Sequence, residues 1–160
     1  MKLLKYVFFL VPAFLIAYLC LVSTAQAADI RQDTVFQAVN AERAAQSLKP
    51  LKQNQELAKA AQAKADDMVK LSYFAHRSPQ GKNVWSFIFK TKALPTVAGE
   101  NLAKGFKTTE STVTAWMNSP SHRANILDRG YTDAGIGVAT GSVNGKSVVY
   151  VVQVFGEFTQ

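Results

Sequence analysis

Apolar residues in the first half of the chain recur every three or four positions, the spacing that places them on one face of an α-helix. The strongest pattern predicts a helix over residues 54–70, and its small alanines would let a neighbouring element approach closely. Weaker patterns predict a helix over residues 29–47 and another that opens at residues 108–111 and ends near Asn118. The stripe on the strongest helix comprises Leu57, Ala61, Ala65, Met68 and Leu71.

One polar face of the first predicted helix leaves two interpretations open. Asn40 and Arg43 lie three positions apart and therefore share a side of the helix. That side either faces solvent, or Asn40 points inward and braces a loop.

The pattern changes to that of strands near the end of the chain. Residues 131–139 form an apolar run interrupted by glycines, and Asn144-Gly145 favours a hairpin turn. Residues 148–155 are almost continuously apolar, which is typical of a central strand covered on both faces. Residues 97–103 fit a short strand or an extended loop. Helices followed by a hairpin predict an α+β fold, with helices packed against an antiparallel sheet.

The N-terminus has the pattern of a secretory signal peptide. Lys2 and Lys5 precede an uncharged run at residues 6–22, and Ala25-Gln26-Ala27 fits a cleavage site. We expect a signal peptide at residues 1–27 and one domain at residues 28–160. The alternative is that residues 6–22 stay in place as a membrane anchor.

Composition limits which cellular compartment and which classes of partner we expect. Cys20 is the only cysteine, so the predicted domain has neither a disulfide nor a thiol nucleophile. The formal net charge of +7 favours anionic cell-envelope polymers or lipid headgroups as partners. The basic residues are scattered, without the aromatic-interleaved cluster typical of nucleic-acid binding. We expect a monomer that is secreted, periplasmic or held at the cell envelope.

Two histidines are the first candidates for chemistry. His76 and His122 both lie beside Ser-Pro in turn-like sequence. Because proline donates no backbone hydrogen bond, we expect Pro120 to end the preceding helix and to leave His122 on a short turn facing a cleft. Two histidines in loops favour one shared site, since loops commonly carry binding groups.

Two glutamates are candidates for the same site. Glu100 lies between Gly99 and Asn101, where glycine lets another element pass close to the backbone. Glu110 opens a predicted helix, where a carboxylate stabilises the helix dipole without any further role. Two imidazoles and two carboxylates can bind zinc or another divalent cation, or perform acid–base chemistry. The chain has no His-Glu-x-x-His pattern that would fix a metal site by spacing.

Several short stretches, in this order and spacing, resemble one known family. They are residues 39–43 (Val-Asn-Ala-Glu-Arg), 74–76 (Phe-Ala-His), 99–102 (Gly-Glu-Asn-Leu), 116–127 (Trp-Met-Asn-Ser-Pro-Ser-His-Arg-Ala-Asn-Ile-Leu) and 153–156 (Gln-Val-Phe-Gly), together with Glu110. The family is the CAP superfamily of cysteine-rich secretory proteins, antigen 5 and plant pathogenesis-related proteins. The chain looks most like its bacterial SCP-like branch.

The resemblance has implications for the fold and the site. It implies a three-layer α-β-α sandwich with a central antiparallel sheet. It also implies a cleft tetrad, which binds zinc or another divalent cation in some members and here would comprise His76, Glu100, Glu110 and His122. The chain departs from many eukaryotic members, which are tied by disulfides and often carry a histidine where this chain has Val39. Sterol-binding and plant-type peptide functions are therefore not carried over.

Three functions remain open from the sequence. The first is an exported binding module whose tetrad binds a cation or organises the cleft for a ligand. The second is a metal-assisted hydrolase of peptides or cell-wall polymer, in which Glu100 or Glu110 would activate a zinc-bound water. The third is a lipid carrier with an apolar groove near Trp85, Phe87 and Ile88, although large apolar residues of this kind are ordinarily core.

Overall fold

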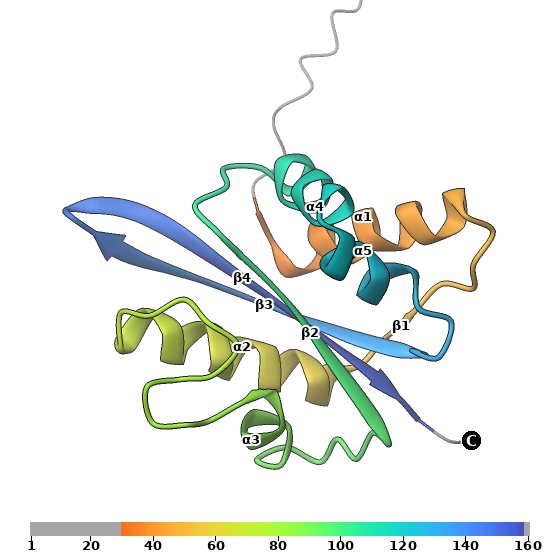
Figure 1. Cartoon of the computed structure of the whole chain (residues 1–160), viewed down its shortest axis with the longest axis horizontal. Helices are drawn as coiled ribbons and strands as arrows, with labels where there is room; N and C mark the ends of the chain where they lie inside the picture. Colours follow the sequence, from red (N-terminus) through yellow and green to blue (C-terminus); the bar gives the residue numbers. More distant parts are fainter. Residues whose placement is uncertain (1–29, 159–160) are drawn as a thin grey trace, which may run out of the picture.

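The computed structural model describes residues 30–158, and within this range the chain forms five helices and four strands (Figure 1). The helices are α1 (Gln32–Ala45), α2 (Gln55–Lys70), α3 (Val84–Ile88), α4 (Thr109–Asn118) and α5 (Pro120–Leu127). The strands are β1 (Lys52–Gln53), β2 (Val97–Lys104), β3 (Asp133–Val143) and β4 (Lys146–Glu157). Between residues 30 and 158, no helix is both long enough and apolar enough to cross a membrane. The signal peptide predicted at residues 1–27 and the alternative anchor at residues 6–22 lie outside the described range.

The four strands form one sheet in the order β1-β3-β4-β2. Strand β4 pairs antiparallel with both β3 and β2, and its residues 150–156 are buried, which confirms the central strand predicted from the sequence. Strand β1 runs parallel to β3 over only two residue pairs. The sheet is therefore antiparallel at its centre and mixed overall.

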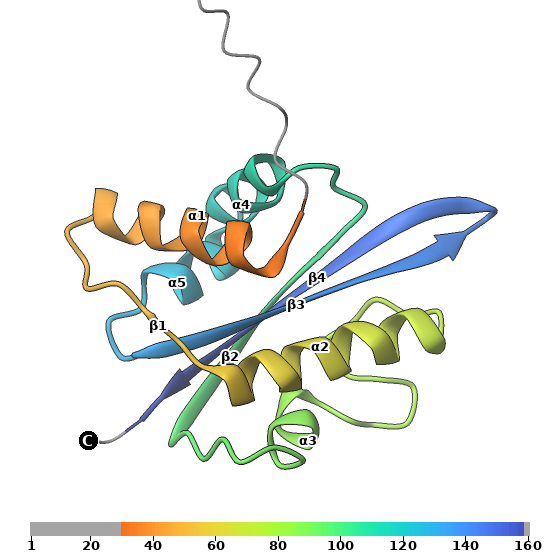
Figure 2. The same cartoon turned by 180° about the vertical axis from the view of Figure 1, so that it is seen from behind.

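Helices cover both faces of this sheet (Figures 1 and 2). Helices α1, α4 and α5 pack on one face, around Val39, Trp116 and Phe155. Helices α2 and α3 pack on the other face, around Leu57 and Met68. The predicted three-layer α-β-α sandwich is confirmed, and so is the assignment of Met68 to the core.

Side-chain caps set where two of the helices begin. The Asn54 side-chain oxygen accepts hydrogen bonds from the backbone N–H groups of Glu56 (3.0 Å) and Leu57 (3.1 Å), so α2 starts just after it. The Thr108 hydroxyl accepts from the backbone N–H of Ser111 at 3.1 Å and caps α4 in the same way. Both starts agree with the boundaries predicted from the sequence.

The segments that the sequence left open are settled. Residues 84–88 form α3, whose Phe87 and Ile88 are buried as ordinary core. Residues 97–103 belong to β2. Asn40 points inward and braces the chain after α1, because its amide exchanges two hydrogen bonds with the backbone of Leu51, at 2.9 and 3.1 Å.

The prediction that Pro120 ends a helix and leaves His122 on a turn is wrong in its second half. Helix α4 does end at Asn118, but Pro120 is the first residue of α5. The first turn of a helix has no acceptor for the N–H that proline lacks, and the fixed φ of proline suits that position. Ser119 is therefore both the C-cap of α4 and the N-cap of α5, and His122 lies in the first turn of α5.

Backbone contact between α2 and β3 holds one face of the sandwich together. A Cβ atom on Gly135 would overlap the backbone of Ala58, and one on Gly137 would overlap the backbone of Ala61. Only glycine permits this approach on the strand side. On the helix side, small alanines allow it, as the sequence predicted. The helix therefore lies directly on the strand, without an intervening layer of side chains.

We expect Gly137→Ala to lower the free energy of unfolding by about 3 kcal/mol, because the added methyl group overlaps helix backbone that cannot rotate away. Urea denaturation followed by circular dichroism measures the change. Gly141→Ala is the matched control on the same strand, since its methyl group would meet only side chains, chiefly that of Val69. Equal losses in the two variants would contradict the role given to the backbone contact.

Candidate functional site

A histidine–glutamate pair occupies one edge of the sheet. His76 Nδ1 lies 2.6 Å from Glu100 Oε1. Glu100 belongs to the edge strand β2 and its side chain is only 4% exposed, whereas His76 lies in the loop after α2 and is 63% exposed. Within the described range, the second carboxylate oxygen of Glu100 is buried and has no hydrogen-bond partner. The pair thus joins a buried carboxylate to a solvent-accessible imidazole.

The surroundings of Glu100 affect its protonation in opposite directions. Burial raises the pKa of the Glu100 carboxyl group, while the hydrogen bond from His76 and the charge of Lys64 lower it. When the carboxylate accepts a hydrogen bond from Nδ1–H, a neutral His76 is held in the tautomer whose Nε2 carries a free lone pair. The exposed ring nitrogen is then available to a ligand.

Lys64 fixes the loop that carries His76. Its side chain is completely buried, and its ammonium group donates to the carbonyl oxygens of Ala75 (2.9 Å) and His76 (3.1 Å) and to the hydroxyl of Tyr73 (3.1 Å). Burial lowers the pKa of Lys64, and the charges of Glu100 and Asp67 oppose that shift. Sequence reasoning missed this residue, although the spacing placed it on the apolar stripe of α2, three positions after Ala61.

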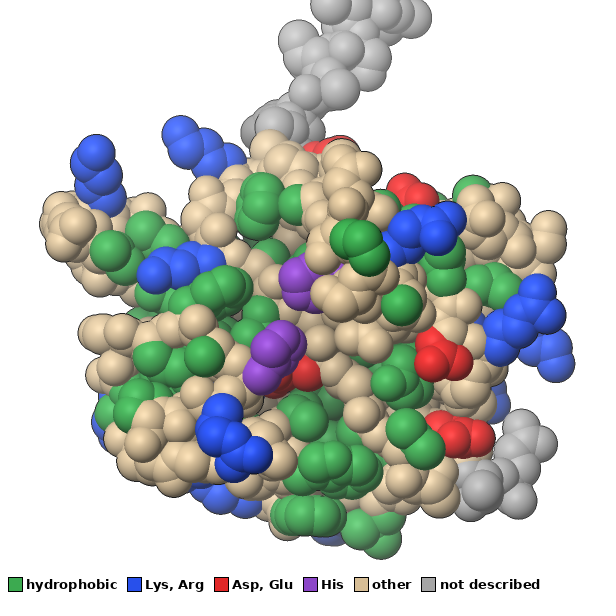
Figure 3. Space-filling view, in the orientation of Figure 1, with side chains coloured by type: hydrophobic (Ala, Val, Ile, Leu, Met, Phe, Trp, Pro, Cys, Tyr) green, Lys and Arg blue, Asp and Glu red, His purple; other side chains and the backbone are tan. Residues whose placement is uncertain are grey.

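His122 approaches the same edge from the other helical layer. Burial lowers the pKa of His122, and the charge that His76 carries when protonated lowers it further. Figure 3 shows both histidine side chains on one face of the molecule, with an acidic side chain beneath one of them. The structure therefore places three of the four predicted site residues at one edge of the sheet.

Two asparagines clamp α5 onto β2 and set the position of His122. The side chain of Asn101 donates to the backbone oxygen of His122 at 3.1 Å. The side chain of Asn125 donates to Asn101 Oδ1 at 2.9 Å and to the backbone oxygen of Glu100 at 3.2 Å. Sequence reasoning placed both asparagines in matching motifs but gave them no role.

Glu110 is set apart from the other three predicted residues. It is exposed in the first turn of α4 and forms no hydrogen bond or ion pair with His76, Glu100 or His122. Its position agrees with the simpler interpretation, a carboxylate that favours the helix start. In the described part of the chain, no three His, Cys, Asp or Glu side chains are grouped so that they could hold a metal ion.

The donors that remain fit a two-imidazole site better than a four-ligand site. The buried, unpartnered oxygen of Glu100 marks an incompletely satisfied polar pocket beside His76. His76 offers Nε2, and burial lowers the pKa of His122, which favours the neutral ring that a metal ligand requires. Glu100 is already engaged with Nδ1 and fits the outer shell, where it would orient the ring.

The three-layer sandwich is the fold of solved SCP-domain proteins. Solved structures with this fold include an extracellular SCP-domain protein from Bacillus anthracis, at 26% identity and a TM-score of 0.67, over 79% of this chain and 40% of that one. An outer surface protein from Borrelia burgdorferi has a TM-score of 0.68 at 22% identity, over 79% and 92% of the two chains, and shares the fold.

The sequence comparisons give the family. Residues 36–155 match the family model of CAP, the cysteine-rich secretory protein family, so this chain belongs to that family. A relative from Bacillus subtilis, the uncharacterized protein YkwD, is 44% identical over 110 residues, which cover 68% of this chain and 43% of the relative. The chain spans less than half the length of the curated relatives it matches.

We expect Lys64→Met to lower the free energy of unfolding by about 2 kcal/mol, because buried acceptors in the His76 loop lose their donor. Urea denaturation measures the loss, and the His76 ring signals in an NMR spectrum should shift with it. Lys59→Met is the control on the same helix, since Lys59 is exposed and pairs only with Glu56 at the surface. A Lys64 variant as stable as this control would contradict the bracing role.

Proposed function

We propose that this chain is a binding domain outside the cell or at the cell envelope, and that its cleft holds a divalent cation such as zinc between the imidazoles of His76 and His122. The observation that carries the proposal is the 2.6 Å contact between His76 Nδ1 and the buried carboxylate of Glu100. Histidines that bind metals through one ring nitrogen commonly donate the other N–H to a carboxylate. The contact therefore orients His76 in the way that a metal site requires.

Each residue of such a site would have a separate role. His76 and His122 would be the protein ligands, and Glu100 would fix the ring and the tautomer of His76. Lys64 would hold the backbone of the His76 loop, and Asn101 would hold the backbone of His122. The cation would supply positive charge to attract an anionic group of a ligand.

The proposed location follows from the relatives and from the chain's charge. One relative of known structure is described as an extracellular protein. The predicted signal peptide at residues 1–27 and the formal charge of +7 agree with export towards anionic envelope material. Anionic envelope polymers or lipid headgroups are the partners that we propose.

The hydrolase alternative has less support from the geometry. Catalytic zinc usually takes three protein ligands, and this cleft offers two imidazoles. A general base must reach a bound water, but one oxygen of Glu100 is engaged by His76 and the other is buried. Glu110, the other candidate base, is exposed on α4. We therefore propose binding rather than hydrolysis.

Calorimetric zinc titration of the purified protein tests the proposal. We expect a dissociation constant of about 10 μM or tighter, lost in both His76→Ala and His122→Ala, because each variant removes a ligand. Glu100→Gln should weaken binding by about 10- to 100-fold, as the loss of outer-shell carboxylates does elsewhere.

Glu110→Gln is the control that separates two imidazoles from a four-residue tetrad. It should bind zinc as the unchanged protein does, and its thermal unfolding should also match. A loss of affinity in Glu110→Gln would show that the tetrad acts together. No zinc binding by the folded, unchanged protein would exclude the cation site.

A further inference from the structure

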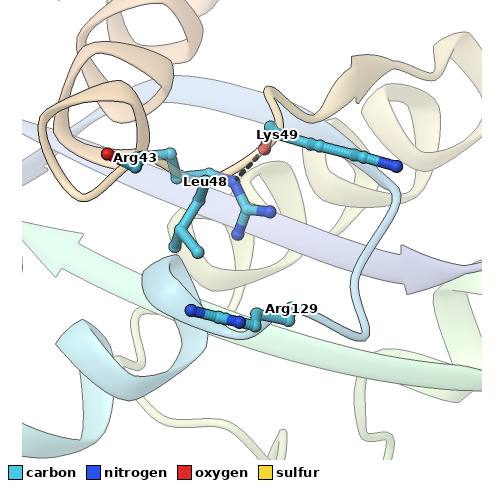
Figure 4. A pocket seen from close by; sticks show the side chains of 5 residues that line it. Arg43, Leu48, Lys49 and Arg129 are labelled. Atoms are coloured by element: carbon cyan, nitrogen blue, oxygen red, sulfur yellow. Dashed lines mark hydrogen bonds between the residues drawn. The ribbon is translucent and has the colours of Figure 1, made fainter.

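A second polar pocket lies below the end of α1, where the chain leaves that helix. It has a volume of about 350 Å³ and is lined by Arg43, Ser47, Leu48, Lys49 and Arg129. Figure 4 shows Arg43 and Arg129 on facing sides of the pocket, with Leu48 between them. Three of the lining side chains are cationic and none is acidic. We call the group formed by Arg43, Lys49 and Arg129 the cationic pocket.

Arg43 is the buried member of the cationic pocket, at 2% exposure. Its Nε donates to the carbonyl oxygen of Lys49 at 3.0 Å (Figure 4), and its Nη1 donates to the carbonyl oxygens of Ile126 at 2.8 Å and Asp128 at 2.7 Å. These acceptors satisfy the N–H groups of Nε and Nη1 but carry no full negative charge. Between residues 30 and 158, Arg43, Lys49 and Arg129 form no ion pair with a carboxylate.

Asp128 is the carboxylate whose charge acts on Arg43. That charge raises the pKa of Arg43, while burial, the larger effect, lowers it. The Asp128 carboxylate is turned towards its own loop, where Oδ1 accepts a hydrogen bond from the backbone N–H of Gly130 at 2.8 Å. The positive charge of the pocket is therefore only partly compensated from within the protein.

Incomplete compensation has a physical consequence for ligands. A buried cation costs free energy unless it is paired, and like charges around one cavity add to that cost. An anion in the pocket would offset both effects, in a setting where the low dielectric strengthens the attraction. In the space-filling view, lysine and arginine side chains also gather at the right-hand edge, near the end of α1 (Figure 3).

The neighbouring surface limits what such a ligand can be. A second cavity of about 440 Å³ shares Arg43, Lys49 and Arg129 and continues past Lys52 to Asp133. A negative group would occupy the cationic side and avoid the carboxylate at the far end. The space therefore suits a small anionic group that carries a neutral polar substituent.

We infer that the cationic pocket binds a phosphate-type oxyanion, as a monoester or as a diester within a polymer. Arginine offers forked donors that match phosphate oxygens, and two arginines with one lysine can neutralise a doubly charged group. The pocket adjoins the cavity that Lys52 of the edge strand β1 lines, whereas the histidine–glutamate pair lies at the β2 edge. This inference is independent of the proposed cation site, and either one can fail without the other.

Calorimetric or NMR titration of the full chain at low salt, with three probes, tests the inference. The probes are inorganic phosphate, glycerol 3-phosphate and a glycerol phosphate polymer. Arg43 is left intact because its hydrogen bonds hold the fold, and the test variant is Lys49→Gln with Arg129→Gln. The matched control is Lys90→Gln with Lys92→Gln, which also removes two positive charges, but from the segment that follows α3.

We expect the pocket variant to bind the probes at least about tenfold more weakly, because charge-assisted hydrogen bonds are lost, while the control changes less than about twofold. Binding of the polymer and glycerol 3-phosphate would identify an ester as the ligand, and binding of inorganic phosphate alone would identify the free ion. Equal losses in both variants would overturn the inference in favour of diffuse attraction by net charge. Absence of binding by the unchanged, folded protein would overturn it outright. Zinc affinity should be the same in all three proteins.

Discussion

The need to satisfy buried charge determines the positions of the loops in this molecule. Arg43, Lys64 and Glu100 are almost completely removed from solvent, and each would cost several kcal/mol if left without polar partners. Arg43 donates hydrogen bonds to backbone carbonyls on both sides of its pocket, and Lys64 donates to carbonyls of the loop after α2. Glu100 forms a hydrogen bond with the His76 ring. These hydrogen bonds anchor loop backbone to the helical layers.

Helix α5 connects the two polar regions that result. Its first turn carries His122, which Asn101 ties to the β2 edge, and the carbonyl of Ile126 near its last turn accepts from Arg43. A cation at the end of a helix meets the negative end of the helix dipole, so Arg43 also stabilises α5 electrostatically. The imidazole site and the cationic pocket are therefore built on opposite ends of one short helix.

The sequence predicted the fold more completely than the site, and the reason is the range of the contacts involved. The period of apolar residues reveals which face of a helix is buried, and Asn144-Gly145 specifies a turn locally, so α2 and the β3–β4 hairpin followed directly. The start of α5 at Pro120 could not be predicted from the sequence, because proline both ends and begins helices. Lys64 had a local signal, its place on an apolar stripe, but its acceptors lie beyond the end of α2 and only the folded chain shows them. The two histidines in turn-like sequence already favoured one shared site, and the resemblance to the family implied the four-residue tetrad. The separation of Glu110 from the histidine–glutamate pair is visible only in three dimensions.

The layered architecture explains why both polar regions lie at edges. Strands β3 and β4 are covered by helices on both faces, and Gly135 and Gly137 bring α2 into backbone contact with β3, which leaves no space there for a ligand. The predicted domain contains no cysteine, so this dense packing must hold the fold without disulfides. Groups of polar side chains can then be accommodated only where a layer ends, beside β2 on one side and beside β1 on the other. The packing that stabilises the domain thus also decides where polar side chains can gather.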